Sequence, residues 1–300
     1  MRIDSHQHFW RYNPQEYGWI DESMSALRRD FLPEDLEPEL TRTGFDCSIA
    51  VQARQTLEET RWLLGLAEGR RAIAGVIGWV DLRSPALKAQ LEEFAANPRL
   101  LGVRHIVQSE PDDFLLEPRF VRGVEMLAEF GLTYDILIYT KHLPVAREFV
   151  ERFREQRFVL DHMAKPPIRR REREDWATGI RAMGKFGNVM CKLSGLVTEA
   201  DWEDWEPDDI RPYLDVAVEA FGWERLMVGS DWPVCLVAAR YSEVVDLFED
   251  YFGGASGEVR DAVFGGNAAR FWKLDERSSA EGTKRDASGS VMKHPLSSRL

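Results

Sequence analysis

The segment Arg225–Trp232 (RLMVGSDW) indicates the fold, because its apolar run 226–228 leads through a glycine into the polar pair Ser230-Asp231. A short strand that is apolar at successive positions is typical of parallel sheets, which are buried on both faces. Seven other segments have the same β-rich, apolar character: Arg2–Phe9, Phe45–Gln52, Ile73–Asp81, Leu100–Val107, Thr133–Thr140, Arg157–Ala164 and Val189–Leu196. The sequence therefore predicts eight buried parallel strands.

Segments with helical spacing of apolar residues separate these strands. In Ser84–Ala96, Pro85 stands in the first turn, and Leu87, Leu91 and Phe94 form an apolar stripe. Similar patterns occur in Thr56–Glu68, Pro118–Phe130, Leu143–Arg154, Glu172–Phe186, Pro207–Phe221 and Tyr241–Phe252. This alternation predicts a (β/α)8 TIM barrel over residues 1–274. A doubly wound open sheet is the alternative, but the glycine-rich phosphate-binding turns that commonly accompany it are missing from the sequence.

Two regions interrupt the alternation. Residues Trp10–Leu40 form a long, aromatic-rich connection after the first strand, and such loops either build active sites and lids or pack over the barrel rim. Residues 275–300 are rich in Ser, Lys, Arg, Glu and Gly, so we expect a disordered C-terminal tail.

Composition restricts the partners and the compartment. The 300 residues carry a formal net charge of −12, which disfavours nucleic acid and anionic membranes as partners. The three cysteines, Cys47, Cys191 and Cys235, are widely spaced, as expected for reduced core thiols. We find no secretory signal and no membrane-spanning run, so we expect a cytoplasmic protein. The sequence leaves the oligomeric state open, a homo-oligomer included.

Polar residues gather where the predicted strands end, which is the catalytic face of a barrel. Four of the six histidines, His6, His8, His105 and His162, fall there, together with Asp231. His6 and His8 are two residues apart, so they share one side of a strand and suit a divalent metal or an oxyanion. Hydrogen-bonded structural histidines, and a helix N-cap at position 231, are the alternatives.

The roles of the neighbouring polar residues are less clearly indicated by the sequence. Arg104 and His105 are adjacent, so a regular strand directs at most one of them to the centre. His162 could form a structural pair with Asp161. Ser194 lacks the G-x-S-x-G context of a nucleophile, so we exclude it from that role.

The order of local motifs resembles the lactonase group of the amidohydrolase superfamily, which includes L-fuconolactonases, L-rhamnonolactonases and 2-pyrone-4,6-dicarboxylate lactonases. The resemblance covers roughly residues 1–274 and rests on the segments Asp4–Trp10 (DSHQHFW), Gly102–His105 (GVRH), Leu160–Pro166 (LDHMAKP), Lys192–Gly195 (KLSG), Gly229–Pro233 (GSDWP) and Gly266–Phe271 (GNAARF). It implies hydrolysis of a small-molecule lactone, with Asp231 as the general base and His6, His8 and His162 around the carbonyl or a metal ion.

Other residues are candidates for binding the substrate. Those near the strand ends or on the aromatic connection are Arg104, His105, Lys165, Trp232, Gln52, Arg54 and Trp19. Because aromatic residues suit a sugar face and only Arg104 and Arg54 can be placed near the site, we favour a sugar lactone over a dicarboxylate. A 2-pyrone-4,6-dicarboxylate-type lactonase, a zinc-dependent decarboxylase and a non-catalytic binding protein are the alternatives.

One departure from the superfamily pattern concerns the metal. Metal-dependent relatives usually carry a histidine at the end of the fifth strand, whereas this strand reads Tyr134–Thr140 (YDILIYT), and the next histidine is His142. The fourth strand also offers no lysine for carbamylation. These features argue against a binuclear centre. One Zn²⁺ bound by His6, His8, His162 and Asp231, or a metal-free site, both remain open.

Overall fold

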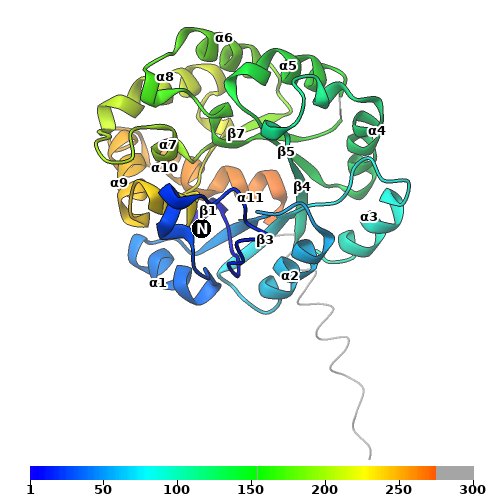
Figure 1. The fold of residues 1–300 in the computed structure, drawn as a ribbon. Coiled ribbons are helices and arrows are strands. Elements are labelled where there is room, and N and C mark those ends of the chain that lie inside the picture. The colour runs from blue at the N-terminus through cyan, green and yellow to red at the C-terminus, as the bar shows by residue number, and fades with distance from the viewer. Residues whose placement is uncertain (154, 275–300) are drawn as a thin grey trace, which may run out of the picture.

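The computed structural model describes residues 1–153 and 155–274, and its centre is a barrel of eight parallel strands in sequential order (Figure 1). The strands are β1 (Ile3–Gln7), β2 (Cys47–Val51), β3 (Ile73–Gly78), β4 (Leu100–Ile106), β5 (Thr133–Leu137), β6 (Phe158–Leu160), β7 (Val189–Leu193) and β8 (Leu226–Val228). Backbone hydrogen bonds from His8 to Trp232 (2.6 Å) and from Asp231 to His6 (2.8 Å) join the last strand to the first. The predicted TIM barrel is therefore confirmed, and the open-sheet alternative is wrong.

Helices surround the barrel (Figure 1). They are α1 (Pro33–Thr43), α2 (Leu57–Ala67), α3 (Leu87–Ala95), α4 (Pro118–Leu127), α5 (Leu143–Glu151), α6 (Glu174–Met183), α7 (Leu196–Glu199), α8 (Pro207–Phe221), α9 (Tyr241–Tyr251), α10 (Gly257–Asp261) and α11 (Asn267–Trp272), with a π-helical turn at Ala262–Gly266. Helix α1 starts with Pro33 and ends at Gly44, which is left-handed at φ 76°. It lies partly inside the connection that the sequence predicted to be a loop.

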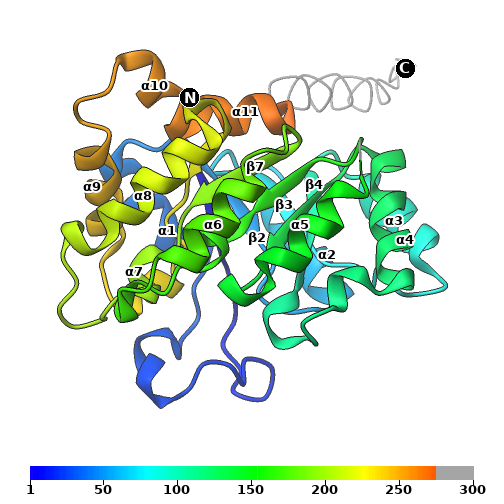
Figure 2. The same ribbon diagram turned by 90° about the horizontal axis from the view of Figure 1, so that it is seen from above.

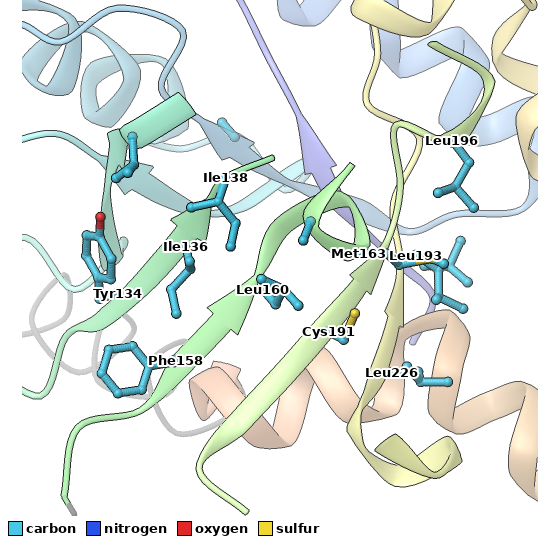
Figure 3. Packing of buried hydrophobic residues seen from close by; sticks show 14 of the residues in the cluster. Tyr134, Ile136, Ile138, Phe158, Leu160, Met163, Cys191, Leu193, Leu196 and Leu226 are labelled. Carbon is cyan, nitrogen blue, oxygen red and sulfur yellow. The ribbon is translucent and has the colours of Figure 1, made fainter. Parts of the chain in front are cut away.

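The core has two layers, because alternate strand residues face opposite sides of the barrel wall. Phe158 and Leu160 belong to the larger cluster, which fills the space between the strands and the helices (Figure 3). Val159, between them in sequence, belongs to a smaller cluster with Met190, Met227 and Trp272 of α11. Helix α11 therefore closes one end of the barrel.

The connection after β1 lies at the opposite end from α11 (Figure 2). Trp10 and Phe31 exchange backbone hydrogen bonds of 3.0 and 2.9 Å, which close residues 11–30 into one loop. The ring of Phe31 packs edge-to-face on Trp232, with centroids 5.2 Å apart. The aromatic connection thus covers the carboxyl ends of β1 and β8.

Two further predictions concern the C-terminal tail and membrane-spanning segments. The predicted C-terminal tail, 275–300, lies outside the described residues. Among residues 1–153 and 155–274, no helix combines the length and the apolar character that crossing a membrane requires.

Candidate active site

Three imidazoles and one carboxylate converge at the carboxyl end of the barrel. Asp231 Oδ1 lies 3.3 Å from His8 Nε2, 3.7 Å from His6 Nε2 and 3.8 Å from His162 Nε2. The Nε2 atoms of His6 and His8 are 3.3 Å apart. All four side chains are at least nine-tenths buried. The structure therefore brings together the four residues predicted as the catalytic and metal-binding set.

Left-handed backbone orients two of these side chains. Residues His162–Lys165 have φ values between 50° and 57°, and Asp231 has a φ of 58°. Non-glycine residues in this region cost about 1–2 kcal/mol each. Hydrogen bonds hold the run in place: the Lys165 amide donates to the His162 carbonyl (2.8 Å), and the Trp176 indole donates to the Met163 carbonyl (2.7 Å). Such strain at a site is typical of functional geometry.

Two glycines let the backbone approach the cluster closely. A Cβ on Gly195 would lie 2.7 Å from His162 Nδ1 and 3.1 Å from Asp231 Oδ2, and its φ is +64°. A Cβ on Gly229 would lie 2.8 Å from the Cβ of His6. A side chain at either position would displace the centre.

The Nδ1 atoms of the three histidines face a second set of partners. His8 Nδ1 lies 2.8 Å from the Val51 carbonyl, which can only accept, so this nitrogen carries the proton and Nε2 keeps its lone pair. His162 Nδ1 lies 2.9 Å from Ser194 Oγ. His6 Nδ1 lies 3.4 Å from Asp161 Oδ1. Each imidazole is thus oriented with Nε2 toward Asp231.

A fully buried set of charges lies beneath the centre. Asp161 contacts Arg104 Nη1 at 3.0 Å and Lys192 Nζ at 3.0 Å, and Lys192 also contacts Asp135 at 2.6 Å. Two carboxylates and two cations balance one another, as buried charges require. Although burial opposes ionisation, Lys192, His6 and Arg104 hold the pKa of Asp161 well below its ordinary value. Asp161 therefore stays ionised beside His6.

Burial and neighbouring charges set the protonation state of the cluster. Burial lowers the pKa of His162 to about 4 and lowers that of His6 well below its ordinary value. Burial raises the pKa of Asp231, but the histidines beside it, His162 foremost, bring it below its ordinary value. At neutral pH, the imidazoles of His6 and His162 are therefore uncharged, and Asp231 is negatively charged.

This donor set fits a divalent metal ion. Tetrahedral donors bound at about 2.0–2.1 Å are separated by about 3.3–3.4 Å, and the distances among His6 Nε2, His8 Nε2 and Asp231 Oδ1 measure 3.3–3.7 Å. His162 Nε2 lies 3.8 Å from Asp231 Oδ1. His6, His8 and Asp231 form one potential ligand group, and His6, Asp161 and His162 form another. One feature competes with a metal: Arg104 Nη1 lies 3.2 Å from His6 Nε2 and can donate to its lone pair.

The residues predicted to bind substrate occupy different places. Arg104 faces the centre, and Gln52 Nε2 donates to its carbonyl at 3.2 Å. His105 faces the helix layer instead, because it follows Arg104 in a regular strand; it stacks on Phe114 and contacts Glu110 at 2.8 Å.

Of the remaining four, Lys165 pairs with Glu199 at 3.3 Å on the loop after β6, and the other three lie around the aromatic connection or at its edge. Trp232 is buried beneath Phe31, and Trp19 is 41% exposed against Trp10. Arg54 is paired with Glu16 and lies 5.4 Å from the ring centroid of Tyr17, so it fastens the connection to the end of β2.

Two important carboxylates did not stand out in the sequence. Asp161 was interpreted as a partner of His162, yet it faces His6, Arg104 and Lys192 because the left-handed turn at His162 breaks the strand alternation. Asp4 accepts hydrogen bonds from the amide and the hydroxyl group of Ser230. The sequence feature that could have identified Asp4 is its charge inside a predicted buried strand, two positions before His6.

Together, a closed parallel barrel and a histidine–aspartate centre at the carboxyl ends of β1, β6 and β8 define the class of protein. The family model described as Amidohydrolase matches residues 3–274, and the chain belongs to this family. The resemblance found in the sequence is thereby confirmed.

Several relatives cover nearly the whole chain. An L-fucono-1,5-lactonase from Burkholderia multivorans is 43% identical over 93% of this chain and 98% of its own length. An L-fucono-1,5-lactonase from Burkholderia ambifaria is 37% identical over 93% and 97%. The crystal structure of a Burkholderia multivorans amidohydrolase with bound zinc is 43% identical, with a TM-score of 0.88 over 91% of this chain and 99% of that one.

Proposed function

We propose that this protein hydrolyses a sugar lactone, an aldonolactone similar to L-fucono-1,5-lactone, to the aldonic acid. The observation that carries the proposal is the convergence of Asp231 Oδ1 with three imidazole Nε2 atoms at 3.3–3.8 Å. The relatives of 43% and 37% identity named L-fucono-1,5-lactonase support this substrate class.

Asp231 is the proton acceptor in this proposal. It takes a proton from the attacking water while the oxygen adds to the lactone carbonyl carbon, a role that contributes on the order of 10²- to 10⁴-fold in rate. The bond between the carbonyl carbon and the ring oxygen then breaks. The proton returns from Asp231 to the ring oxygen, which becomes the hydroxyl group of the open-chain acid.

The cationic side of the centre stabilises the negative charge that develops on the carbonyl oxygen. Arg104 places a permanent positive charge 3.2 Å from His6 Nε2, at 3% exposure to solvent. A charge held in a water-poor site stabilises an oxyanion without reorganising solvent, which contributes on the order of 10²- to 10³-fold.

Zn²⁺ is the ion we propose for His6, His8, His162 and Asp231, on the strength of the zinc-bound relative and of the spacing of the His6, His8 and Asp231 donors. When bound, it would polarise the carbonyl group and lower the pKa of a bound water toward about 7.

The charges near the barrel mouth favour a neutral substrate over a dicarboxylate. Lys141 pairs with Asp112 at 2.7 Å, Arg170 with Glu172 at 3.0 Å, and Arg54 with Glu16. A dianionic substrate calls for cations that lack such partners. A polyhydroxylated lactone makes no such demand.

A pH-indicator assay of acid release tests the proposal on L-fucono-, L-galactono-, L-rhamnono- and D-arabinono-lactones and on 2-pyrone-4,6-dicarboxylate. We expect rapid turnover of a stereochemically related subset of the sugar lactones, with L-fucono-1,5-lactone among them. Acid release no faster than the spontaneous rate for every sugar lactone, with or without added Zn²⁺, would contradict the proposed function.

A further inference from the structure

A cleft of about 540 Å³ is lined by residues of the loops that follow β5, β6 and β7. Its lining includes Tyr139, Lys165, Thr198, Glu199 and Trp202. This volume is within the range that small-molecule sites occupy. The cleft therefore has room for a monosaccharide ring.

An ion pair between two of these loops lies in the cleft. Lys165 Nζ is 3.3 Å from Glu199 Oε1, and the two side chains retain 20% and 21% exposure, so both remain accessible. The ammonium group also lies 5.5 Å from the ring centroid of Tyr139. The pair is thus largely desolvated but open toward the cleft.

Each member of the ion pair is close in sequence to a residue of the centre or to a residue that packs against the centre. The amide of Lys165 donates to the His162 carbonyl at 2.8 Å, within the left-handed run that orients His162. Glu199 ends helix α7, which starts directly after Gly195, the residue packed against His162 and Asp231. The backbone segments that position His162 and Gly195 therefore also position the two charges.

The chemistry of the pair matches hydroxyl groups. A hydroxyl donates one hydrogen bond and accepts others, whereas an ammonium group only donates and a carboxylate only accepts. Lys165 can therefore donate a hydrogen bond to one ring hydroxyl while Glu199, beside it, accepts one from a neighbouring hydroxyl. Tyr139, which is 39% exposed, and the indole of Trp202 offer apolar faces for the C–H groups of a sugar.

We propose that Lys165 and Glu199 form the hydroxyl-recognition site that selects polyhydroxylated lactones over unsubstituted ones. This inference rests on the proposed function and identifies the residues that bind the hydroxyl groups of the sugar lactone. Glu199 has a second effect, because its negative charge disfavours a substrate that carries a carboxylate at the same place. The same residue therefore selects against dicarboxylates.

Two lactones of the same ring size separate this role from a structural one. We would measure kcat/KM for L-fucono-1,5-lactone and for δ-valerolactone, which has the six-membered lactone ring without hydroxyl groups. The proteins are the wild type, Lys165→Met, Glu199→Gln and the control Arg61→Met, whose guanidinium group pairs with Glu93 at an exposed position outside the lining of the cleft.

We expect Lys165→Met and Glu199→Gln each to lower kcat/KM for the sugar lactone by about 10- to 100-fold, because a charged hydrogen-bond partner of a hydroxyl is lost. Turnover of δ-valerolactone should stay within about twofold, and the control should resemble the wild type with both lactones.

The remaining outcomes overturn the proposal. Equal losses for both lactones would assign the pair a structural role, and no loss for either would remove it from substrate recognition. A wild type that hydrolyses δ-valerolactone but no sugar lactone would also contradict hydroxyl recognition, while leaving ester hydrolysis in place. A wild type inactive on both lactones would instead refute the proposed function, and the recognition site with it.

Discussion

The buried carboxylate of Asp4 accepts two hydrogen bonds from Ser230, one from the amide at 2.9 Å and one from the hydroxyl group at 2.6 Å. It therefore fixes the residue immediately before Asp231, at the junction where β8 closes onto β1. Tyr241 of α9 donates a third hydrogen bond to this carboxylate at 3.1 Å. Burial raises the pKa of Asp4 to about 6, so the group is mainly ionised at neutral pH.

We expect Asp4→Asn to lower kcat about tenfold and the free energy of unfolding by about 1–3 kcal/mol, because buried donors lose a charged acceptor. Steady-state kinetics and urea unfolding measure the two effects. Asp46→Asn is the control, since Asp46 accepts a hydrogen bond from the Arg2 amide at an exposed position. Wild-type kcat in Asp4→Asn would remove Asp4 from the support of Asp231.

Gly195→Ala should lower kcat/KM by at least about 100-fold, because the new Cβ would meet His162 Nδ1 at 2.7 Å. Because Gly195 has a positive φ, the alanine should also lower the free energy of unfolding by about 1–2 kcal/mol. Gly187→Ala is the matched control, since a Cβ there would meet no atom within 4 Å. If the two variants had equal activity, close packing at 195 would not matter for the centre.

Much of the fold could be predicted from the sequence because a parallel barrel buries its strands on both faces. All eight predicted strands are present, and their ends bring His6, His8, His162 and Asp231 together. Helix α1 was missed because Pro38 and four acidic residues obscure its short apolar stripe, Leu36 and Leu40. The seven helices that were predicted from apolar spacing are all present.

Parts of the site depend on backbone conformations that the sequence does not encode visibly. Arg104 and His105 follow strand alternation, so one faces the centre and the other faces the helices. Asp161 and His162 do not, because His162 is left-handed without being a glycine. The balanced charges of Asp135 and Lys192 depend on contacts between strands two apart, which spacing along the chain cannot reveal.

The pH profile of kcat/KM should reflect the lowered pKa of His162. Because that pKa is about 4 rather than the ordinary 6.5, we expect constant kcat/KM from about pH 6 to 8 and a fall below about pH 5. The unfolded chain takes up this proton first, so the same shift lowers stability as pH falls from 6.5 toward 4.

One control and one contradicting outcome accompany this pH profile. Enzyme held at the acidic pH and returned to pH 7.5 should recover full activity, which separates titration from unfolding. A midpoint near 6.5 in metal-free enzyme would show that His162 titrates as an exposed imidazole does.

Arg104→Gln should raise the affinity for Zn²⁺ about tenfold, equivalent to about 1.4 kcal/mol. The substitution removes a positive charge and a competing donor 3.2 Å from His6 Nε2. Competition with a chromophoric chelator measures the affinity without relying on turnover, and circular dichroism checks the fold. Unchanged or weaker zinc binding in a folded variant would show that Arg104 does not compete with the metal.

The central claim is that Asp231 activates water for attack on a sugar lactone. The most direct measurement is kcat for L-fucono-1,5-lactone in the wild type and in Asp231→Asn, with thermal unfolding recorded for both. We expect wild-type turnover well above spontaneous hydrolysis and a loss of at least about 100-fold in a variant that remains folded. Near-wild-type turnover by Asp231→Asn would contradict the claim.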